Sequence, residues 1–162
     1  MEVFSNNILL TNLIKIRWIA IFGQLFAIII AFLYFDLNIQ VLPCIYIVFF
    51  SVVVNIYSYA KNKTNNYLSD KEAFYFLLFD TIQLGFLLYL TGGIYNPFSL
   101  LLIAPLIISA SYLPIFYSIC LLILSVFIVM VISNFYLPIY WKEAFNVPYL
   151  FKYGLSLSLV LT

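Results

Sequence analysis

Residues 115–137 read IFYSICLLILSVFIVMVISNFYL, a stretch of apolar, aromatic and small polar side chains without a charge. A helix that crosses the hydrocarbon core of a bilayer needs about 20 such residues. A continuous apolar run of this length is typical of a helix that satisfies its own backbone hydrogen bonds in lipid. The stretch therefore predicts a transmembrane helix, and similar runs elsewhere in the chain decide the fold.

The composition of the whole chain indicates a membrane protein. Of its 162 residues, 66% are hydrophobic and 8% are charged, and the mean hydropathy is +1.14. A water-soluble fold of this length cannot bury so much apolar surface. The chain has no histidine, which excludes a histidine base, a histidine ligand for metal or haem, and phosphorylation of a histidine within it. The formal net charge of +1 offers no basic field for nucleic acid. The predicted class is all-α, a polytopic membrane helix bundle.

Runs of sufficient length predict five full transmembrane helices and the start of a sixth. The five lie at about 18–35, 41–60, 73–91, 97–113 and 115–137, and the incomplete sixth at 149–162. Residues 1–16 precede a transmembrane domain that extends over residues 17–162. Because the last run is still apolar at Thr162 and is too short to cross a bilayer, we expect the protein to continue beyond it.

The basic residues predict the orientation, because cytoplasmic loops carry an excess of lysine and arginine. Lys15 and Arg17 precede the first span. Three further lysines lie between the second and third spans, at Lys61, Lys63 and Lys71. Both segments are therefore placed on the same side, and the amino terminus is predicted to be cytoplasmic.

The segment 90–99, LTGGIYNPFS, separates the third predicted span from the fourth. Gly92 and Gly93 end a helix, since glycine adopts positive φ at little cost and lets other groups approach the backbone. Asn96 and Pro97 begin the next helix, because asparagine is a favoured N-cap and proline suits the first helical position. These features are typical of a tight turn at the outer end of two helices, and they also suit a ligand site.

The groups of this turn match the needs of a quinone. The helix N-terminus presents free N–H groups, which with the Asn96 amide could donate to a carbonyl oxygen at the membrane boundary. Tyr95 and Phe98 could stack on a flat ring whose tail stays in lipid. The spacing alone does not choose a quinone over a lipid head group.

The heptapeptide at 92–98, GGIYNPF, resembles the GGxxNPF motif of RegB/PrrB-type redox-responsive sensor histidine kinases. The resemblance covers residues 17–162, and its other elements are Arg17-Trp18, Gly23-Gln24, Val54-Asn55, Phe79-Asp80, Gln83-Leu84, Ala104-Pro105 and Val147-Pro148. It implies a six-helix sensor region in the bacterial inner membrane, part of a two-component phosphorelay. It also implies reversible binding of ubiquinone, with no metal and no haem. The implied quinone-binding residues are Gly92, Gly93, Tyr95, Asn96, Pro97 and Phe98.

The resemblance further implies a homodimer, and a response regulator that is engaged only through the kinase region. In that family the phosphoacceptor histidine, the redox-active cysteine and the ATP-binding domain lie downstream of the membrane region, and none is present here. Cys44 and Cys120 fall inside apolar runs, where small buried hydrophobes are expected, so they do not inherit the redox role. This chain alone is expected to carry no catalytic residue and no metal site.

Asp80 is the acidic residue that lies deep in a predicted span, and such residues are candidates for function. Counting along the helices places Gln24 and Asn55 at a similar depth on two other spans, so we expect the three side chains to meet. They either hold the helices together or relay a shift of the third helix. Pro105 could kink the fourth helix and serve the same relay.

These observations predict a sensor of the ubiquinone pool that relays the quinone state to a kinase domain. A carrier or channel subunit is one alternative, against which a single deep acid and no evident inverted repeat argue. A membrane assembly subunit without a ligand is the other, and for it the turn is only a turn.

Overall fold

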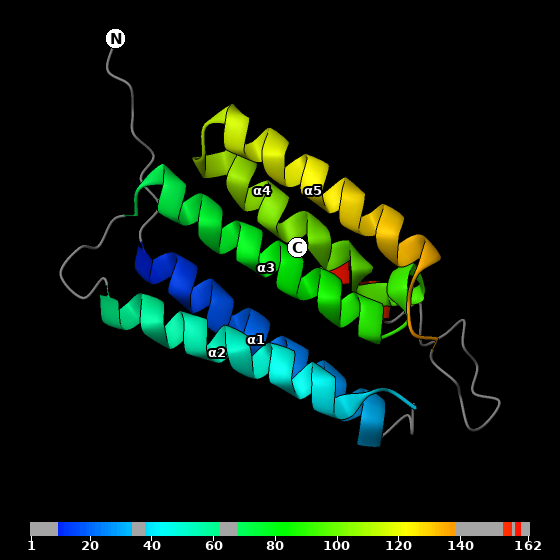
Figure 1. Ribbon diagram of the computed structural model, residues 1–162. Coiled ribbons are helices and arrows are strands. Elements are labelled where there is room, and N and C mark those ends of the chain that lie inside the picture. Colours follow the sequence, from blue (N-terminus) through cyan, green and yellow to red (C-terminus); the bar gives the residue numbers. More distant parts are fainter. Residues whose placement is uncertain (1–9, 34–37, 62–67, 139–153, 157, 160–162) are drawn as a thin grey trace, which may run out of the picture.

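The computed structural model describes residues 10–33, 38–61, 68–138, 154–156 and 158–159 (Figure 1). These ranges hold helices and no strand, which confirms the predicted all-α class. The elements are α1 (Leu10–Leu33), α2 (Val41–Lys61), α3 (Asp70–Leu90), η1 (Gly93–Tyr95), η2 (Pro97–Leu102), α4 (Ile103–Tyr112) and α5 (Ile115–Asn134), where η marks a 3-10 helix.

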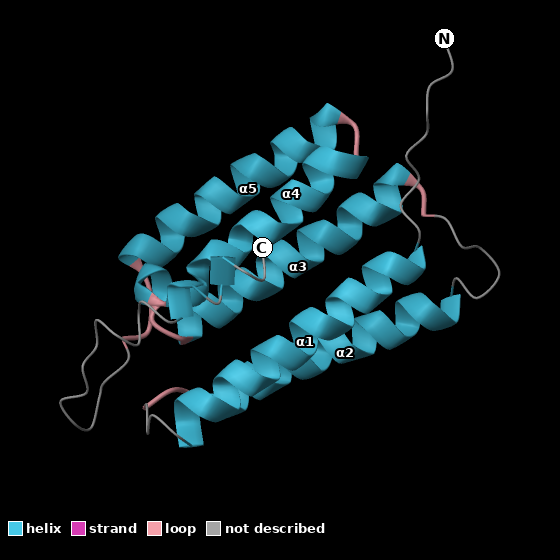
Figure 2. Ribbon diagram, turned by 180° about the vertical axis from the view of Figure 1, so that it is seen from behind, coloured by secondary structure: helices cyan, strands magenta, loops and turns pink. Residues whose placement is uncertain are grey.

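Helix α3 lies at the centre of the bundle (Figure 1, Figure 2). The α1–α2 hairpin packs along one side of α3, and the α4–α5 hairpin packs along the other. The end of α3, the two 3-10 helices and the end of α5 come together at one end of the bundle, which we call the turn end. The start of α1, the end of α2 and the start of α3 lie at the opposite end.

Local sequence signals set where the helices begin and end. Helix α3 begins with a capping box, in which the Ser69 hydroxyl accepts the Glu72 N–H and the Glu72 carboxylate accepts the Ser69 N–H at 3.1 Å. Helix α4 ends at Tyr112, and Pro114 caps the start of α5. A residue that precedes proline avoids the helical conformation, and Leu113 is accordingly extended, with φ of −104° and ψ of 155°.

Four helices are long and apolar enough to cross a bilayer within the described ranges: Asn12–Leu33, Val41–Ala60, Asp70–Leu90 and Ile115–Asn134. The prediction of five full spans was therefore wrong by one. The predicted span 97–113 is a shorter apolar helix, Pro97–Tyr112, because the Asn96 cap and Pro114 bound it closely on both sides. The predicted sixth span, 149–162, lies largely outside the described residues.

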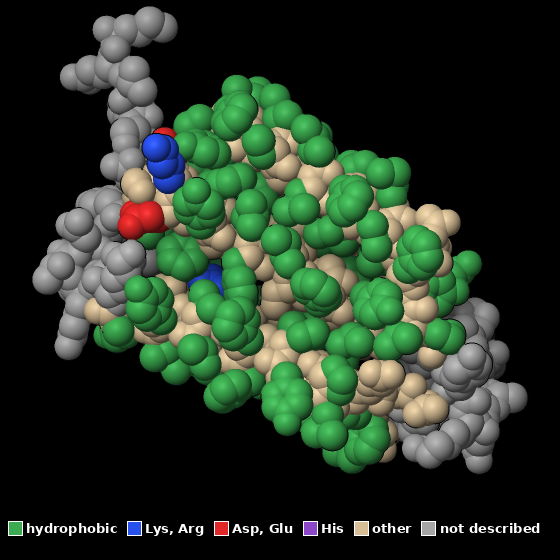
Figure 3. Space-filling model, viewed as in Figure 1, with side chains coloured by type: hydrophobic (Ala, Val, Ile, Leu, Met, Phe, Trp, Pro, Cys, Tyr) green, Lys and Arg blue, Asp and Glu red, His purple; other side chains and the backbone are tan. Residues whose placement is uncertain are grey.

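Large apolar side chains cover the outside of the bundle. Ile115 is 78% exposed and Leu33 is 73% exposed, and many phenylalanines and isoleucines are similarly open. Figure 3 shows hydrophobic side chains over most of the visible face, with charged groups gathered mainly at one end. A surface of this kind would be unstable in water, and it is the surface expected of helices that face lipid. The chain is a membrane-embedded protein.

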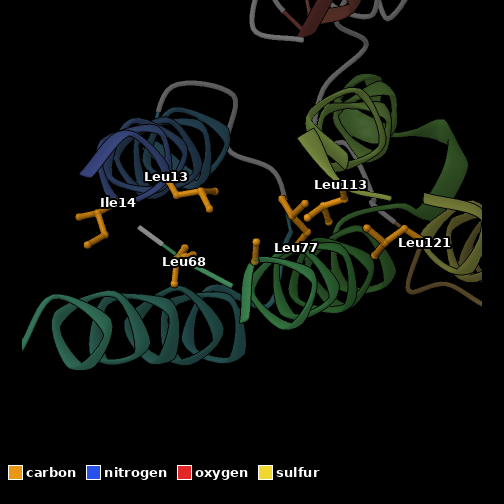
Figure 4. Packing of buried hydrophobic residues seen from close by; sticks show 7 residues of the cluster. Leu13, Ile14, Leu68, Leu77, Leu113 and Leu121 are labelled. Carbon is orange, nitrogen blue, oxygen red and sulfur yellow. The ribbon is translucent and has the colours of Figure 1, made fainter. Parts of the chain in front are cut away.

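The apolar interior joins the helices on both sides of α3. One buried cluster contains Leu13 and Ile14 of α1, Leu77 of α3 and Leu121 of α5. Figure 4 shows these side chains pointing into the space between the helices, together with Leu68 and Leu113. Because α3 contributes to the contacts on both sides, it is the element through which the two hairpins are connected.

Candidate functional site

The turn after α3 has the conformation that its two glycines predict. Gly92 has φ of 97° and Gly93 has φ of 61°, so both lie in the left-handed region that other residues rarely adopt. The chain then forms the 3-10 helix η1 and begins η2 at Pro97. The predicted helix end at the glycines and the predicted helix start at Asn96-Pro97 are therefore confirmed.

Asn96 is the N-cap of η2, and its side-chain amide is fully used within the turn. Its Oδ1 accepts the Phe98 N–H at 2.9 Å. Its Nδ2 donates to the Thr91 carbonyl at 3.0 Å and to the Thr91 hydroxyl at 2.7 Å. An asparagine amide has two N–H donors, so no donor is left for a ligand. In this conformation Asn96 holds the turn in shape, and donation from its amide to a bound carbonyl stays a prediction.

The backbone N–H groups at the start of η2 are also occupied. Pro97 has no N–H, Phe98 donates to the Asn96 side chain, and the Ser99 N–H donates to the Asn96 carbonyl at 2.9 Å. The free donors expected at this helix N-terminus are therefore absent from its first three residues. A carbonyl ligand at this turn would have to find its donors elsewhere.

Gly93 lies against the end of α5, so the space beside it is filled by this chain and is not open to a ligand. A Cβ atom on Gly93 would lie 2.5 Å from the Ile132 carbonyl oxygen and 2.7 Å from Cβ of Tyr136. One residue later, the Leu137 N–H donates to the Tyr89 carbonyl at 2.9 Å. The turn and the segment that follows α5 are thus packed and hydrogen-bonded together.

The exposed part of the turn is aromatic. Tyr95 is 70% exposed, and its ring meets the ring of Tyr136 edge-on, with centroids 5.6 Å apart. Phe98 and Pro97 are half-buried, and Gly154 packs so closely on Pro97 that a Cβ would lie 2.5 Å from Cγ of the proline. Gly92 and Gly93 are buried. Of the predicted quinone-binding residues, Tyr95 and Phe98 therefore present side chains at this surface, and Tyr136 joins them.

Sequence reasoning did not find Tyr136, because it lies about 40 positions after the heptapeptide and has no distinctive neighbours. The one available signal was Gly93 itself. A glycine at positive φ in a packed turn indicates that another group approaches the backbone closely, but it does not identify that group.

A second set of polar contacts lies between α1 and α3, away from the turn end. Arg17 Nε donates to Asp80 Oδ1 at 3.1 Å, and the Arg17 side chain is only 5% exposed. The guanidinium carbon lies 5.2 Å from the ring centre of Phe76 and 5.4 Å from that of Phe79. Asp80 is thus neutralised by a buried arginine held between two aromatic rings.

The three polar residues that were expected to meet have different partners. Gln24 accepts a hydrogen bond from Gln83 Nε2 at 3.0 Å, and Asn55 donates to the Ile14 carbonyl at 3.4 Å. Asp80 pairs with Arg17, and within the described ranges no hydrogen bond or ion pair joins Gln24, Asn55 and Asp80 to one another. The three do all lie at helix contacts, which agrees with a role in holding the helices together.

Arg17 and Gln83 are the partners that the sequence analysis did not identify. In the sequence, Arg17 indicates the orientation and belongs to the resemblance, and Gln83 belongs to the resemblance alone. The available signal was Asp80, because an ionisable group inside a membrane nearly always has a partner, and Arg17 is the basic residue nearest in depth.

The helix that contains Pro105 changes geometry just before that residue. The 3-10 helix η2 ends at Leu102 and the α-helix α4 begins at Ile103. Pro105 is buried within the first turn of α4, where the missing N–H disturbs the helix least. Further along, the Ser109 hydroxyl donates to that of Ser118 at 2.8 Å and joins α4 to α5.

Both cysteines are free thiols, with Cys44 buried in an apolar cluster and Cys120 partly exposed. In the part of the chain that the structure describes, no group of three or more His, Cys, Asp or Glu is placed to hold a metal ion.

A comparison with known proteins finds a similar sequence. Over 154 residues the chain is 34% identical to the sensor histidine kinase RegB of Cereibacter sphaeroides. The match covers 94% of this chain and 33% of that kinase, so the chain spans about a third of the length of the curated relative that it matches. No family model matches the chain, and no solved structure matches it. The resemblance inferred from the heptapeptide is confirmed, because the chain is similar to a RegB sensor histidine kinase over about one third of that kinase.

Proposed function

We propose that the chain is the membrane sensor region of a two-component histidine kinase and that it responds to the redox state of the ubiquinone pool. The observation that supports this most directly is the heptapeptide turn. Its glycines and Asn96 form a closely packed turn in a chain that is 34% identical to RegB over 94% of its length. In this proposal the amino terminus is cytoplasmic, and the turn end faces the outer side of the bacterial inner membrane.

The quinone ring binds on the exposed aromatic surface of the turn. Tyr95 and Phe98 contact the ring, and the hydroxyl groups of Tyr95 and Tyr136 supply the hydrogen-bond donors for its carbonyls. Gly92, Gly93, Asn96 and Pro97 act by shaping the turn, since the Asn96 amide and the Gly92 and Gly93 carbonyls are engaged inside it and Pro97 has no N–H. In this proposal some of the predicted residues contact the quinone and the others shape the turn, and Tyr136 is an additional contact residue.

Signal transfer requires that ubiquinone and ubiquinol stabilise different packings of the helices. Ubiquinone offers only acceptor oxygens, whereas ubiquinol hydroxyls also donate, so the two forms satisfy the tyrosine hydroxyls differently. Because the turn is packed against the ends of both α3 and α5, a change there moves these helices relative to each other. Asp80, Gln24, Asn55 and Pro105 then relay the change towards a kinase domain, in a protein that acts as a homodimer with a response regulator.

Equilibrium binding of ubiquinone and ubiquinol to the intact chain in lipid nanodiscs tests the proposal. Tyr95→Phe and Tyr136→Phe remove one hydroxyl each, and we expect each to weaken binding of the oxidised form about fivefold, the usual effect of one net hydrogen bond. Tyr112→Phe is the matched control, since Tyr112 is also exposed but ends α4 at the other side of the bundle. Equal affinity for the two redox forms, or unchanged binding in both tyrosine variants, would refute the proposal.

The Asn96→Ala variant tests whether Asn96 shapes the turn or contacts the quinone directly. This change leaves the Phe98 N–H and the Thr91 groups without their partner, so it should weaken binding and lower the unfolding temperature together. The tyrosine-to-phenylalanine variants should weaken binding while leaving the unfolding temperature unchanged. If Asn96→Ala lost binding at full stability, the amide itself would contact the quinone, and the proposed division of labour would be wrong.

A further inference from the structure

Two buried polar atoms on neighbouring helices have no hydrogen-bond partner among the described residues. One is Nη2 of Arg17 on α1, whose side chain is 5% exposed, and the other is Oδ1 of Asn55 on α2, which is fully buried. The first is a donor without an acceptor, and the second is an acceptor without a donor. Either group alone would be costly in an apolar interior, where no lipid atom can replace the missing partner.

Arg17 lies on the turn of α1 that Asn55 of α2 contacts. Asn55 reaches α1 through the bond from its Nδ2 to the Ile14 carbonyl. Ile14 and Arg17 are both buried and are three positions apart, so they lie on one face of α1. The Ile14 carbonyl that Asn55 contacts and the start of the Arg17 side chain are therefore within one helical turn of each other.

The charge at this place is already balanced, which restricts what can bind there. Arg17 Nε is paired with the Asp80 carboxylate, and the rings of Phe76 and Phe79 flank the guanidinium. A further anion would face the carboxylate at close range, and a cation would face the guanidinium. The remaining donor and acceptor therefore suit a small neutral molecule that accepts one hydrogen bond and donates another.

We propose that a water molecule binds between α1 and α2 at this point, where it accepts a hydrogen bond from Arg17 Nη2 and donates one to Asn55 Oδ1. The water connects Asn55 to the Arg17–Asp80 pair, so that α1, α2 and α3 share one polar network. Buried waters of this kind satisfy groups that would otherwise lack a partner. The site does not depend on quinone binding at the turn end.

A double-mutant cycle on the unfolding equilibrium of the intact chain in detergent tests the connection. Arg17→Lys keeps a positive charge beside Asp80 but removes Nη2, and Asn55→Leu removes the acceptor at similar volume. If one water joins the two groups, their effects are coupled, and we expect the unfolding constant of the double variant to depart from additivity about fivefold. The cycle of Arg17→Lys with Ser58→Ala is the matched control and should be additive, because Ser58 is buried on α2 near Asn55 and donates to the Val54 carbonyl.

A second measurement uses the unaltered chain, so it does not depend on how the variants fold. In lipid bilayers, solid-state NMR measures the transfer of magnetisation from water to side-chain amide protons. We expect rapid transfer to the Asn55 amide and slow transfer to the Gln83 amide, which is buried against Gln24. Slow transfer to Asn55 would overturn the proposal, and so would an additive Arg17–Asn55 cycle. Coupling without transfer would mean that the two side chains bond directly, which also excludes the water.

Discussion

Arg17 and Asp80 are 63 positions apart in the sequence, and their side chains form a hydrogen-bonded ion pair of 3.1 Å between α1 and α3. Seven residues further along α1, Gln24 accepts a hydrogen bond from Gln83 of α3. The two contacts are about two helical turns apart on α1 and less than one turn apart on α3, so together they constrain the register of α1 against α3. In lipid, where apolar packing gives little preference for one register over another, such polar pairs set the alignment.

Removing the acid of this pair should destabilise the bundle strongly. Asp80→Asn leaves a buried guanidinium without its counter-charge, and breaking a buried pair in this way costs about 3–5 kcal/mol. Thermal unfolding of the purified chain in detergent measures the loss. Asp70→Asn is the control, since Asp70 is exposed in the first turn of α3 and its interaction with the helix dipole is worth about 0.3–1 kcal/mol.

The double variant Arg17→Met with Asp80→Leu should be more stable than the single variant Asp80→Asn. It removes both charges together, so it should recover most of the stability that Asp80→Asn loses. If the double variant were as unstable as Asp80→Asn, the two charges would do more than neutralise each other, and this account of the pair would be wrong.

Replacement of Gly93 by alanine tests the packing of the turn against α5. The new Cβ would meet the Ile132 carbonyl and Tyr136 in a residue with positive φ, so we expect a loss of about 3 kcal/mol from strain and overpacking together. Gly23→Ala is the matched control, because Gly23 lies in α1 with no neighbouring atom within 4 Å of a Cβ. That change should raise stability by about 0.5–1 kcal/mol. If the two variants unfolded alike, the described packing of the turn would be wrong.

The Gln24–Gln83 contact should make a smaller contribution. Side-chain hydrogen bonds between membrane helices average about 0.6 kcal/mol in double-mutant cycles, and a neutral pair should fall near that value. Gln24→Leu, Gln83→Leu and the double variant complete the cycle on the free energy of unfolding. A coupling above about 2 kcal/mol would place this contact in the same class as the ion pair.

The sequence predicted the helical class, most of the spans and the conformation of the turn, because each depends on local properties. Continuous apolar runs identify helices that face lipid, and Gly92, Gly93 and Asn96 act on the backbone within a few residues of themselves. The extra span was predicted because hydropathy does not register the close boundaries that Asn96 and Pro114 impose on the helix between them.

The partners of the polar residues could not be predicted from the same information. Depth along a helix can be counted, but the direction in which a side chain points depends on how the helices are rotated against each other. Gln24 and Asp80 were placed correctly inside the bundle, yet each found its partner on the facing helix and not in a shared cluster. Asn96 was recognised as a cap, and the full use of its amide became visible only with the contacts to Thr91 in place.

The separation of Arg17 from Asp80 along the chain also sets an order of events during synthesis. Arg17 leaves the ribosome 63 residues before Asp80. At a synthesis rate of about 5–20 residues per second, α1 is made several seconds before its counter-charge exists. A lone arginine resists transfer into lipid, so we expect the Arg17 side chain to take its buried position only when α3 arrives. We therefore expect the first helix to reach its final packing only after the third has been inserted.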